Sequence, residues 1–125
     1  GKTKYLITSA NNMLDECVGE VVFINRDNSL VTNLKHEIRY VDISEFPISA
    51  LTQLLAFISG LIAENYDIKA IYVDGLAKYD AKQEQYPDFF ERIKHLSEKF
   101  DTQFVFSVSG DISGIPEYVV KEYSC

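Results

Sequence analysis

The chain opens with Gly1-Lys2-Thr3, residues whose types and order suit the binding of a phosphate group. They match the end of the phosphate-binding loop G-x-x-x-x-G-K-[ST], in which the lysine contacts the β- and γ-phosphates and the hydroxyl reaches Mg²⁺. A helical apolar stripe follows at once, so the tripeptide would stand at a helix N-terminus, where N–H groups attract anions. A glycine at position 1 is also what a purification tag leaves behind, so the tripeptide alone does not establish a phosphate site.

A second residue with suitable chemistry is Asp74, which follows the four apolar residues 70–73. A carboxylate directly after a buried strand is the Walker B arrangement, in which it holds a water of the bound Mg²⁺. Thr3 and Asp74 are therefore the candidate metal-binding residues. The competing interpretation is structural, since an aspartate also caps the turn that begins at Gly75.

Polar residues also end the other predicted strands, in clusters at positions 25–28, 42–45 and 107–111. In an open parallel sheet the ligand binds in a crevice beyond the carboxyl ends of the strands. These clusters and Asp74 should therefore share one edge of the molecule.

The elements that must position these residues alternate along the chain. Apolar residues at helical spacing predict a helix from about Lys4 to Cys17, a second over Ile48–Ala63, a third that Pro87 and Asp88 introduce and that ends near Phe100, and a short one from Pro116. Apolar runs predict strands at 21–24, 37–43, 70–73 and 104–108, the second of them more polar and nearer an edge. This series indicates an α/β fold with a mainly parallel sheet. The connecting segment Leu76–Tyr86 is predicted to be the most polar and mobile part of the chain.

Composition limits the classes of function. The chain has 125 residues, 46% of them hydrophobic and 25% charged, which indicates one packed domain over 1–125. Its net charge of −7 disfavours nucleic-acid backbones and anionic membrane surfaces as partners. The two cysteines, Cys17 and Cys125, are too far apart in sequence to indicate a zinc site or a disulfide scaffold. No leader or membrane-spanning stretch is visible, so the predicted localisation is cytoplasmic.

The order of these motifs and elements resembles the P-loop NTPases of the additional-strand, RecA-like group over most of the chain. Several stretches look more closely like a bacterial family generally labelled as hypothetical ATP-binding proteins, sometimes as twitching-motility ATPase-like proteins. These stretches are Gly1-Lys2-Thr3-Lys4, Val21-Val22-Phe23-Ile24, His36-Glu37-Ile38-Arg39-Tyr40-Val41, Phe57-Ile58-Ser59-Gly60 and Ile71-Tyr72-Val73-Asp74-Gly75-Leu76. The resemblance implies a three-layer sandwich around the parallel sheet, and ATP with Mg²⁺ as ligands.

The resemblance also implies roles for single residues. RecA-like enzymes can place a water-activating carboxylate after the second strand, where Asp27 stands here; the alternative is an ordinary turn residue. The remaining implied nucleotide-binding residues are Gly1, Lys2, Thr3 and Lys4 at the start of the chain, and the candidate γ-phosphate sensors Ser107 and Ser109. For both serines the alternative is a hydroxyl that bonds to nearby backbone.

The sequence departs from this family in two ways. Relatives carry a strand and the first half of the loop before the glycine that matches Gly1, so the chain is expected to be an N-terminally truncated domain that binds ATP poorly by itself. Without that strand, the strand at 104–108 becomes an edge that is expected to form a homodimer. Many hydrolytic relatives also have Glu where this chain has Gly75.

Three hypotheses for the function remain. The leading one is an ATP-binding P-loop domain, possessing ATPase activity only with a complete loop. The second is a non-catalytic α/β module that binds a protein through its loops and helix faces. A receiver-like domain with Asp74 as phosphoacceptor is the weakest, because the acidic pair and the lysine that it needs at other strand ends are missing.

Overall fold

The computed structural model describes residues 2–16 and 19–108, in which helices and strands alternate as the sequence predicts. The predicted helix from Pro116 lies outside these residues. The helices are α1 (Lys2–Glu16), α2 (Leu51–Glu64) and α3 (Gln85–Phe100), and the strands are β1 (Glu20–Asn25), β2 (Arg39–Asp42), β3 (Ile68–Val73) and β4 (Gln103–Phe106). Three short 3₁₀ turns, η1 (Val31–Asn33), η2 (Ile43–Glu45) and η3 (Leu76–Lys78), lie in the connections.

The four strands form one sheet in the order β2-β1-β3-β4, and every neighbouring pair is parallel. Ile24 of β1 pairs with Val41 on one side and Val73 on the other, and Val73 pairs in turn with Phe106. The carboxyl ends of all four strands therefore meet at one edge of the sheet. This confirms the predicted α/β class and parallel sheet, with β2 at one edge and, within the described residues, β4 at the other.

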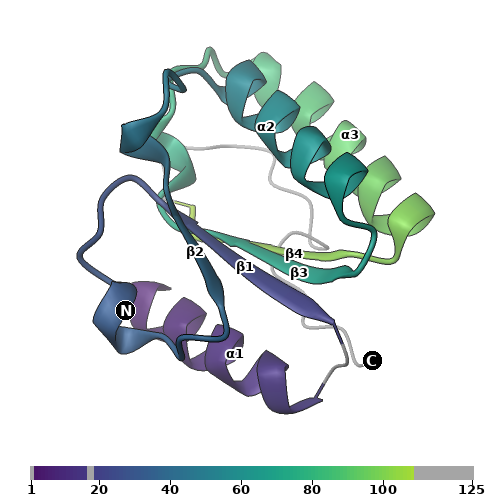
Figure 1. Ribbon diagram of the computed structural model, residues 1–125. Coiled ribbons are helices and arrows are strands. Elements are labelled where there is room, and N and C mark those ends of the chain that lie inside the picture. The colour runs from purple at the N-terminus through teal and green to yellow at the C-terminus, as the bar shows by residue number, and fades with distance from the viewer. Residues whose placement is uncertain (1, 17–18, 109–125) are drawn as a thin grey trace.

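Helices cover the two faces of the sheet, with α1 on one face and α2 and α3 on the other (Figure 1). Alternate residues of β3 serve the two cores: Ile71 and Val73 pack toward α2 and α3, while Ala70 and Tyr72 pack toward α1. Both faces of a central strand are buried, so its side chains are apolar on both sides. This explains why the sequences of the central strands are continuous apolar runs.

Helix α1 begins at Lys2, two residues earlier than the sequence pattern predicts. Its buried stripe is formed by Leu6, Ala10 and Met13. On the same face the Ser9 hydroxyl and the Tyr72 hydroxyl are hydrogen-bonded at 2.8 Å, which ties α1 to the middle of β3. The early start places Thr3 in the first turn of the helix, beside the end of the sheet.

The segment Leu76–Tyr86, predicted to be the most polar and mobile part of the chain, is attached to the core by three buried residues. Leu76, Tyr79 and Tyr86 are buried in the core that α2 and α3 cover. The backbone of Asp80 is bonded to the start of α2, with its N–H donating to the Ser49 carbonyl at 2.8 Å and its carbonyl accepting from the Leu51 N–H at 2.9 Å. Polar letters dominate this stretch, but its widely spaced aromatic residues are the ones that determine its path.

Gly19, which leads into β1, has a φ of +140°, a region that residues with a side chain rarely adopt. A Cβ there would overlap the Lys69 side chain and lie 2.7 Å from the Asp67 carbonyl oxygen. We therefore expect Gly19→Ala to lower the free energy of unfolding by about 2–4 kcal/mol, measured by urea denaturation. Gly60→Ala is the control, because nothing lies within 4 Å of its Cβ position in α2, and it should raise stability by up to ~1 kcal/mol. Equal effects of the two substitutions would contradict the prediction.

Candidate functional site

Two hydroxyl groups from distant parts of the sequence contact one aspartate carboxylate, at the edge of the sheet where the strands end. The Thr3 hydroxyl in the first turn of α1 donates to Asp74 Oδ1 at 3.2 Å and lies 3.3 Å from Oδ2. The Ser107 hydroxyl, just after β4, donates to Asp74 Oδ1 at 2.7 Å. Asp74 is only 6% exposed. We call Thr3, Asp74 and Ser107 the strand-end cluster.

The backbone fixes each member of the cluster. The Asp74 N–H donates to the Ile24 carbonyl at 3.0 Å, and the Ser107 N–H donates to the Val73 carbonyl at 3.0 Å, so both residues continue the pairing of the sheet by one step. Gly75 then turns the chain with a φ of +73°, and its N–H donates to the Ser107 hydroxyl at 2.6 Å. Asp74 and Ser107 are therefore placed by the sheet itself, and not by a loop.

The strand-end cluster has the donor chemistry that Mg²⁺ prefers. A hydroxyl and a carboxylate supply hard oxygen ligands, and Mg²⁺ usually takes one or two carboxylates while water and substrate phosphates complete its shell. Within residues 3–16 and 19–108, no basic side chain forms an ion pair with Asp74. Among the described side chains, the hydrogen-bond partners of this nearly buried carboxylate are hydroxyls, and such a position electrostatically favours a cation. In the described part of the chain, no group of three or more His, Cys, Asp or Glu residues could hold a metal ion.

Asp27 lies at the same edge but in a different setting, exposed in the turn after β1. Its Oδ1 accepts from the Ser29 hydroxyl at 2.6 Å, the Ser29 N–H at 2.9 Å and Asn25 Nδ2 at 3.2 Å. The bonds from the Ser29 hydroxyl and N–H lower the pKa of Asp27, and the Lys78 charge adds to this. Such an aspartate forms an Asx turn, as the structural alternative expects. Its role in activating a water stays a prediction.

The other predicted site residues are less informative. Gly1 and Ser109 lie outside the described residues, and of Lys2 only the backbone, the first residue of α1, is described. Lys4 is exposed on α1. The structure therefore brings together Thr3, Asp74 and Ser107 of the predicted set.

Sequence reasoning gave no role to Arg26 and Tyr79, which lie beside the strand-end cluster. The Arg26 guanidinium stacks over the Tyr79 ring, with its Cζ 5.1 Å from the ring centroid. Burial raises the pKa of Tyr79 to about 12, although the positive charge of Arg26 acts in the opposite direction. The available signal was the position of Arg26 in the polar cluster 25–28, two residues after the apolar run that ends at Ile24.

The raised pKa of Tyr79 predicts a loss of stability at high pH. The native protein keeps the phenol proton up to about pH 12, whereas the unfolded chain releases it near pH ~10. The protonated Tyr79 phenol therefore makes its full contribution to the free energy of unfolding below pH ~10. This contribution falls by about 2 kcal/mol as the pH rises toward 12. Urea unfolding at several pH values should show a smaller loss in Tyr79→Phe than in the wild type. In Tyr66→Phe, which alters an exposed tyrosine, the loss should be unchanged.

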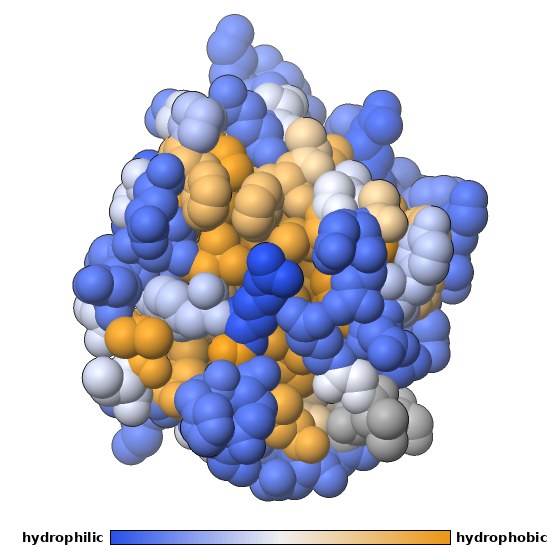
Figure 2. Space-filling model, viewed as in Figure 1, coloured by the Kyte–Doolittle hydropathy of each residue, from blue (hydrophilic) through white to orange (hydrophobic). Residues whose placement is uncertain are grey.

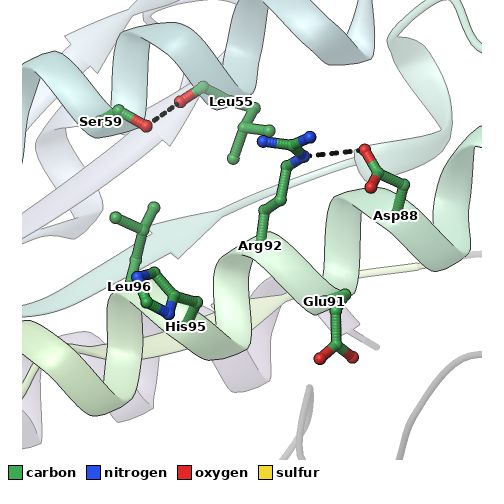
Figure 3. Close-up of a pocket in the computed structure, with 7 residues that line it drawn as sticks. All are labelled: Leu55, Ser59, Asp88, Glu91, Arg92, His95 and Leu96. Atoms are coloured by element: carbon green, nitrogen blue, oxygen red, sulfur yellow. Dashed lines mark hydrogen bonds and ion pairs between the residues drawn. The ribbon is translucent and has the colours of Figure 1, made fainter.

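A concavity that includes no residue of the strand-end cluster lies between α2 and α3 (Figure 3). It has a volume of about 490 Å³ and is lined by Leu55, Ser59, Asp88, Glu91, Arg92, His95 and Leu96. Arg92 Nε donates to Asp88 at 2.9 Å, and the Ser59 hydroxyl donates to the Leu55 carbonyl of its own helix at 2.8 Å. Arg92, Asp88 and Ser59 therefore each have a hydrogen-bond partner within their own helix.

Comparison with known proteins gives no family assignment. No family model matches the chain, and no curated protein matches it. Among solved structures, N-acetylornithine aminotransferase from Stenotrophomonas maltophilia K279a is similar over 83% of this chain, with 14% identity and a TM-score of 0.36. The chain spans 25% of that structure. A likeness at this level says nothing about activity. No helix in the described part of the chain is long and apolar enough to cross a membrane.

Proposed function

We propose that this chain is the nucleotide-binding part of a P-loop domain and that it binds ATP with Mg²⁺ beyond the ends of β3 and β4. One observation carries the proposal: the Thr3 hydroxyl lies within hydrogen-bond distance of both Asp74 oxygens, although 71 positions separate the two residues. A hydroxyl at the start of a helix and a carboxylate after a buried strand are the two protein groups that hold Mg²⁺ in such domains.

The order of the strands supports the same proposal. In RecA-like sheets an additional strand lies between the strand that ends in the Walker B aspartate and the strand that leads into the phosphate loop. Here β4 lies next to β3, which is compatible with that intermediate position. A strand entering the loop would then pair with the side of β4 that has no strand partner in the described sheet and deliver the chain to the start of α1.

Each residue of the site would have a defined task. Lys2 and the N–H groups of the first turn of α1 would bind phosphate oxygens, while Thr3 and Asp74 would hold Mg²⁺. When bound, Mg²⁺ neutralises charge on the phosphates. The Ser107 hydroxyl keeps the Asp74 carboxylate in place from the β4 side. Hydrolysis would further require a residue that orients water, for which Asp27 is the candidate.

Calorimetric titration with Mg-ATP tests the proposal. The 125 residues supply only the last three residues of the loop motif, so we expect weak binding, with a dissociation constant well above ~1 μM. A longer chain in which a strand and G-x-x-x-x precede Gly1 should bind much more tightly, and Lys2→Ala should abolish that binding. Failure of the longer chain to bind Mg-ATP would refute the proposal.

The side of β4 that lacks a strand partner in the described sheet is also a candidate surface for homodimer formation. Phe104, Val105 and Phe106 are each 3% exposed, so their side chains are covered, but in the described sheet β4 has a strand partner on one side alone. An unpaired backbone edge is a template for another strand. Sedimentation should therefore detect dimers at high micromolar concentration, and a monomer under these conditions would exclude this surface.

A protein-binding module remains the second candidate function, because hydrophobic side chains are visible at the opposite edge. Figure 2 shows them gathered in the region of β2, between the layers of helices. Phe46, just after η2, is 49% exposed and lies with its ring centroid 6.0 Å from that of Phe57 on α2. Exposed aromatic residues next to an edge strand favour a protein partner.

A further inference from the structure

Buried polar atoms without partners gather at the edge of the sheet that carries the strand-end cluster. Within the described part of the chain, the buried side-chain atoms that lack a hydrogen-bond partner are Asn25 Oδ1, Arg26 Nη1, Tyr79 Oη and Gln103 Oε1. Asn25 ends β1, Arg26 follows it and Tyr79 follows the η3 turn after β3, whereas Gln103 begins β4 at the other end of the sheet. Each such atom costs about 1–3 kcal/mol, so three of them in one place indicate groups that a ligand satisfies.

Two of these three atoms, Arg26 Nη1 and Tyr79 Oη, can donate a hydrogen bond. Tyr79 is 2% exposed, and stacking of the guanidinium on its ring holds the two side chains together. The Asp74 charge acts on the Tyr79 phenol, so the pair lies within electrostatic reach of the candidate Mg²⁺ site. The exposed Lys78, which precedes Tyr79, adds a second positive charge on the same side.

We infer that Arg26 and Tyr79 bind the terminal phosphoryl group of a nucleoside triphosphate whose Mg²⁺ is held by Thr3 and Asp74. The inference rests on the proposed function and deepens it, because it assigns the pair that distinguishes a triphosphate from a diphosphate.

The chemistry of the pair favours a phosphoryl oxygen as its ligand. A guanidinium and a neutral phenol both present hydrogens, and a metal ion cannot accept them. Phosphate oxygens accept such bonds, and an arginine strengthens them through its charge. Thr3 and Asp74, which are hydrogen-bonded to each other, supply the oxygen atoms that a cation requires, so the cation and the anion would contact different protein groups.

The first test needs no ligand. Because the Tyr79 hydroxyl has no partner in the described residues, Tyr79→Phe should leave the melting temperature unchanged or raise it. Tyr72→Phe is the matched control, since that buried hydroxyl is bonded to Ser9 at 2.8 Å, and its loss should lower the melting temperature by about 4 °C. An equal decrease in both variants would show that the Tyr79 hydroxyl has a structural role and would overturn the inference.

The second test compares Mg-ATP with Mg-ADP by calorimetry, using the longer chain with the complete loop. Arg26→Gln and Tyr79→Phe should weaken Mg-ATP binding by about 10-fold and change Mg-ADP binding by less than ~2-fold. Arg92→Gln, in the groove between α2 and α3, should change neither. Unaltered Mg-ATP binding in both site variants would overturn this inference while leaving the proposed function intact. Absence of nucleotide binding by the wild type would overturn both.

Discussion

Asp74→Asn is expected to weaken Mg²⁺-dependent nucleotide binding at least ~100-fold, about 2.7 kcal/mol. Asparagine has nearly the same shape and keeps one oxygen that can accept from the hydroxyls of Thr3 and Ser107. It lacks the negative charge that makes the position attractive to a cation. Because the charge lies almost buried, its removal should change the free energy of unfolding by less than ~1 kcal/mol. Calorimetry with and without Mg²⁺, together with urea unfolding, measures both quantities.

Asp42→Asn is the matched control for this prediction. Asp42 also ends a strand at the same edge of the sheet, but its carboxylate caps η2 by accepting from the Ser44 N–H at 3.0 Å and the Ser44 hydroxyl at 2.5 Å. We expect this variant to bind nucleotide within ~2-fold of the wild type. If the Asp74 variant retained Mg²⁺-dependent binding, Asp74 would be assigned to turn capping, and the protein-binding module would become the leading function.

Phe90→Ala is expected to cause a large loss of stability, about 3–5 kcal/mol in the free energy of unfolding. The Phe90 ring is fully buried, and its centroid lies 5.4 Å from that of Phe89 and 6.1 Å from that of Phe106. Removing it leaves a cavity between α3 and β4 and removes two edge-to-face ring contacts. The total free energy of unfolding of a domain of this size is only ~5–15 kcal/mol. Denaturation in urea measures the loss.

Phe46→Ala serves as the comparison, because the Phe46 side chain is 49% exposed. We expect this substitution to lower the free energy of unfolding by less than ~1 kcal/mol. A loss below ~1 kcal/mol for Phe90→Ala would mean that the core under α3 can collapse around the missing ring. In that case the position of β4, and with it that of Ser107, would be less fixed than the structure indicates.

Apolar runs and helical spacing were enough to predict the order of the described elements, but not their ends. The strand predicted at 70–73 begins at Ile68, because Lys69 interrupts the apolar run without leaving the strand. Lys69 is partly buried, and its amino group reaches the Asp101 carboxylate at 3.7 Å. The methylene groups of a lysine can pack against the sheet while its amino group stays in water. A pattern of apolar residues alone therefore does not predict that such a lysine belongs to a strand.

The candidate site was predictable where the sheet itself places the residues. Asp74 and Ser107 follow neighbouring parallel strands, so the rule for strand ends brings them together once the strands are recognised. Arg26 and Tyr79 were missed for a different reason. Tyr79 stands between Lys78 and Asp80 in a stretch of polar letters, and its burial depends on packing beneath α2 and α3 that only the folded chain defines.

The parallel sheet also determines when the site can form during folding. In the described sheet no two neighbouring strands are joined by a tight hairpin, so each pairing requires closure of a long chain segment before its contacts contribute. The three residues of the strand-end cluster come from positions 3, 74 and 107 and meet only after β1, β3, β4 and α1 have all assembled. A partly folded chain therefore lacks the complete site. A ligand bound there would select the completed fold and stabilise the whole domain against unfolding, in proportion to the logarithm of its concentration.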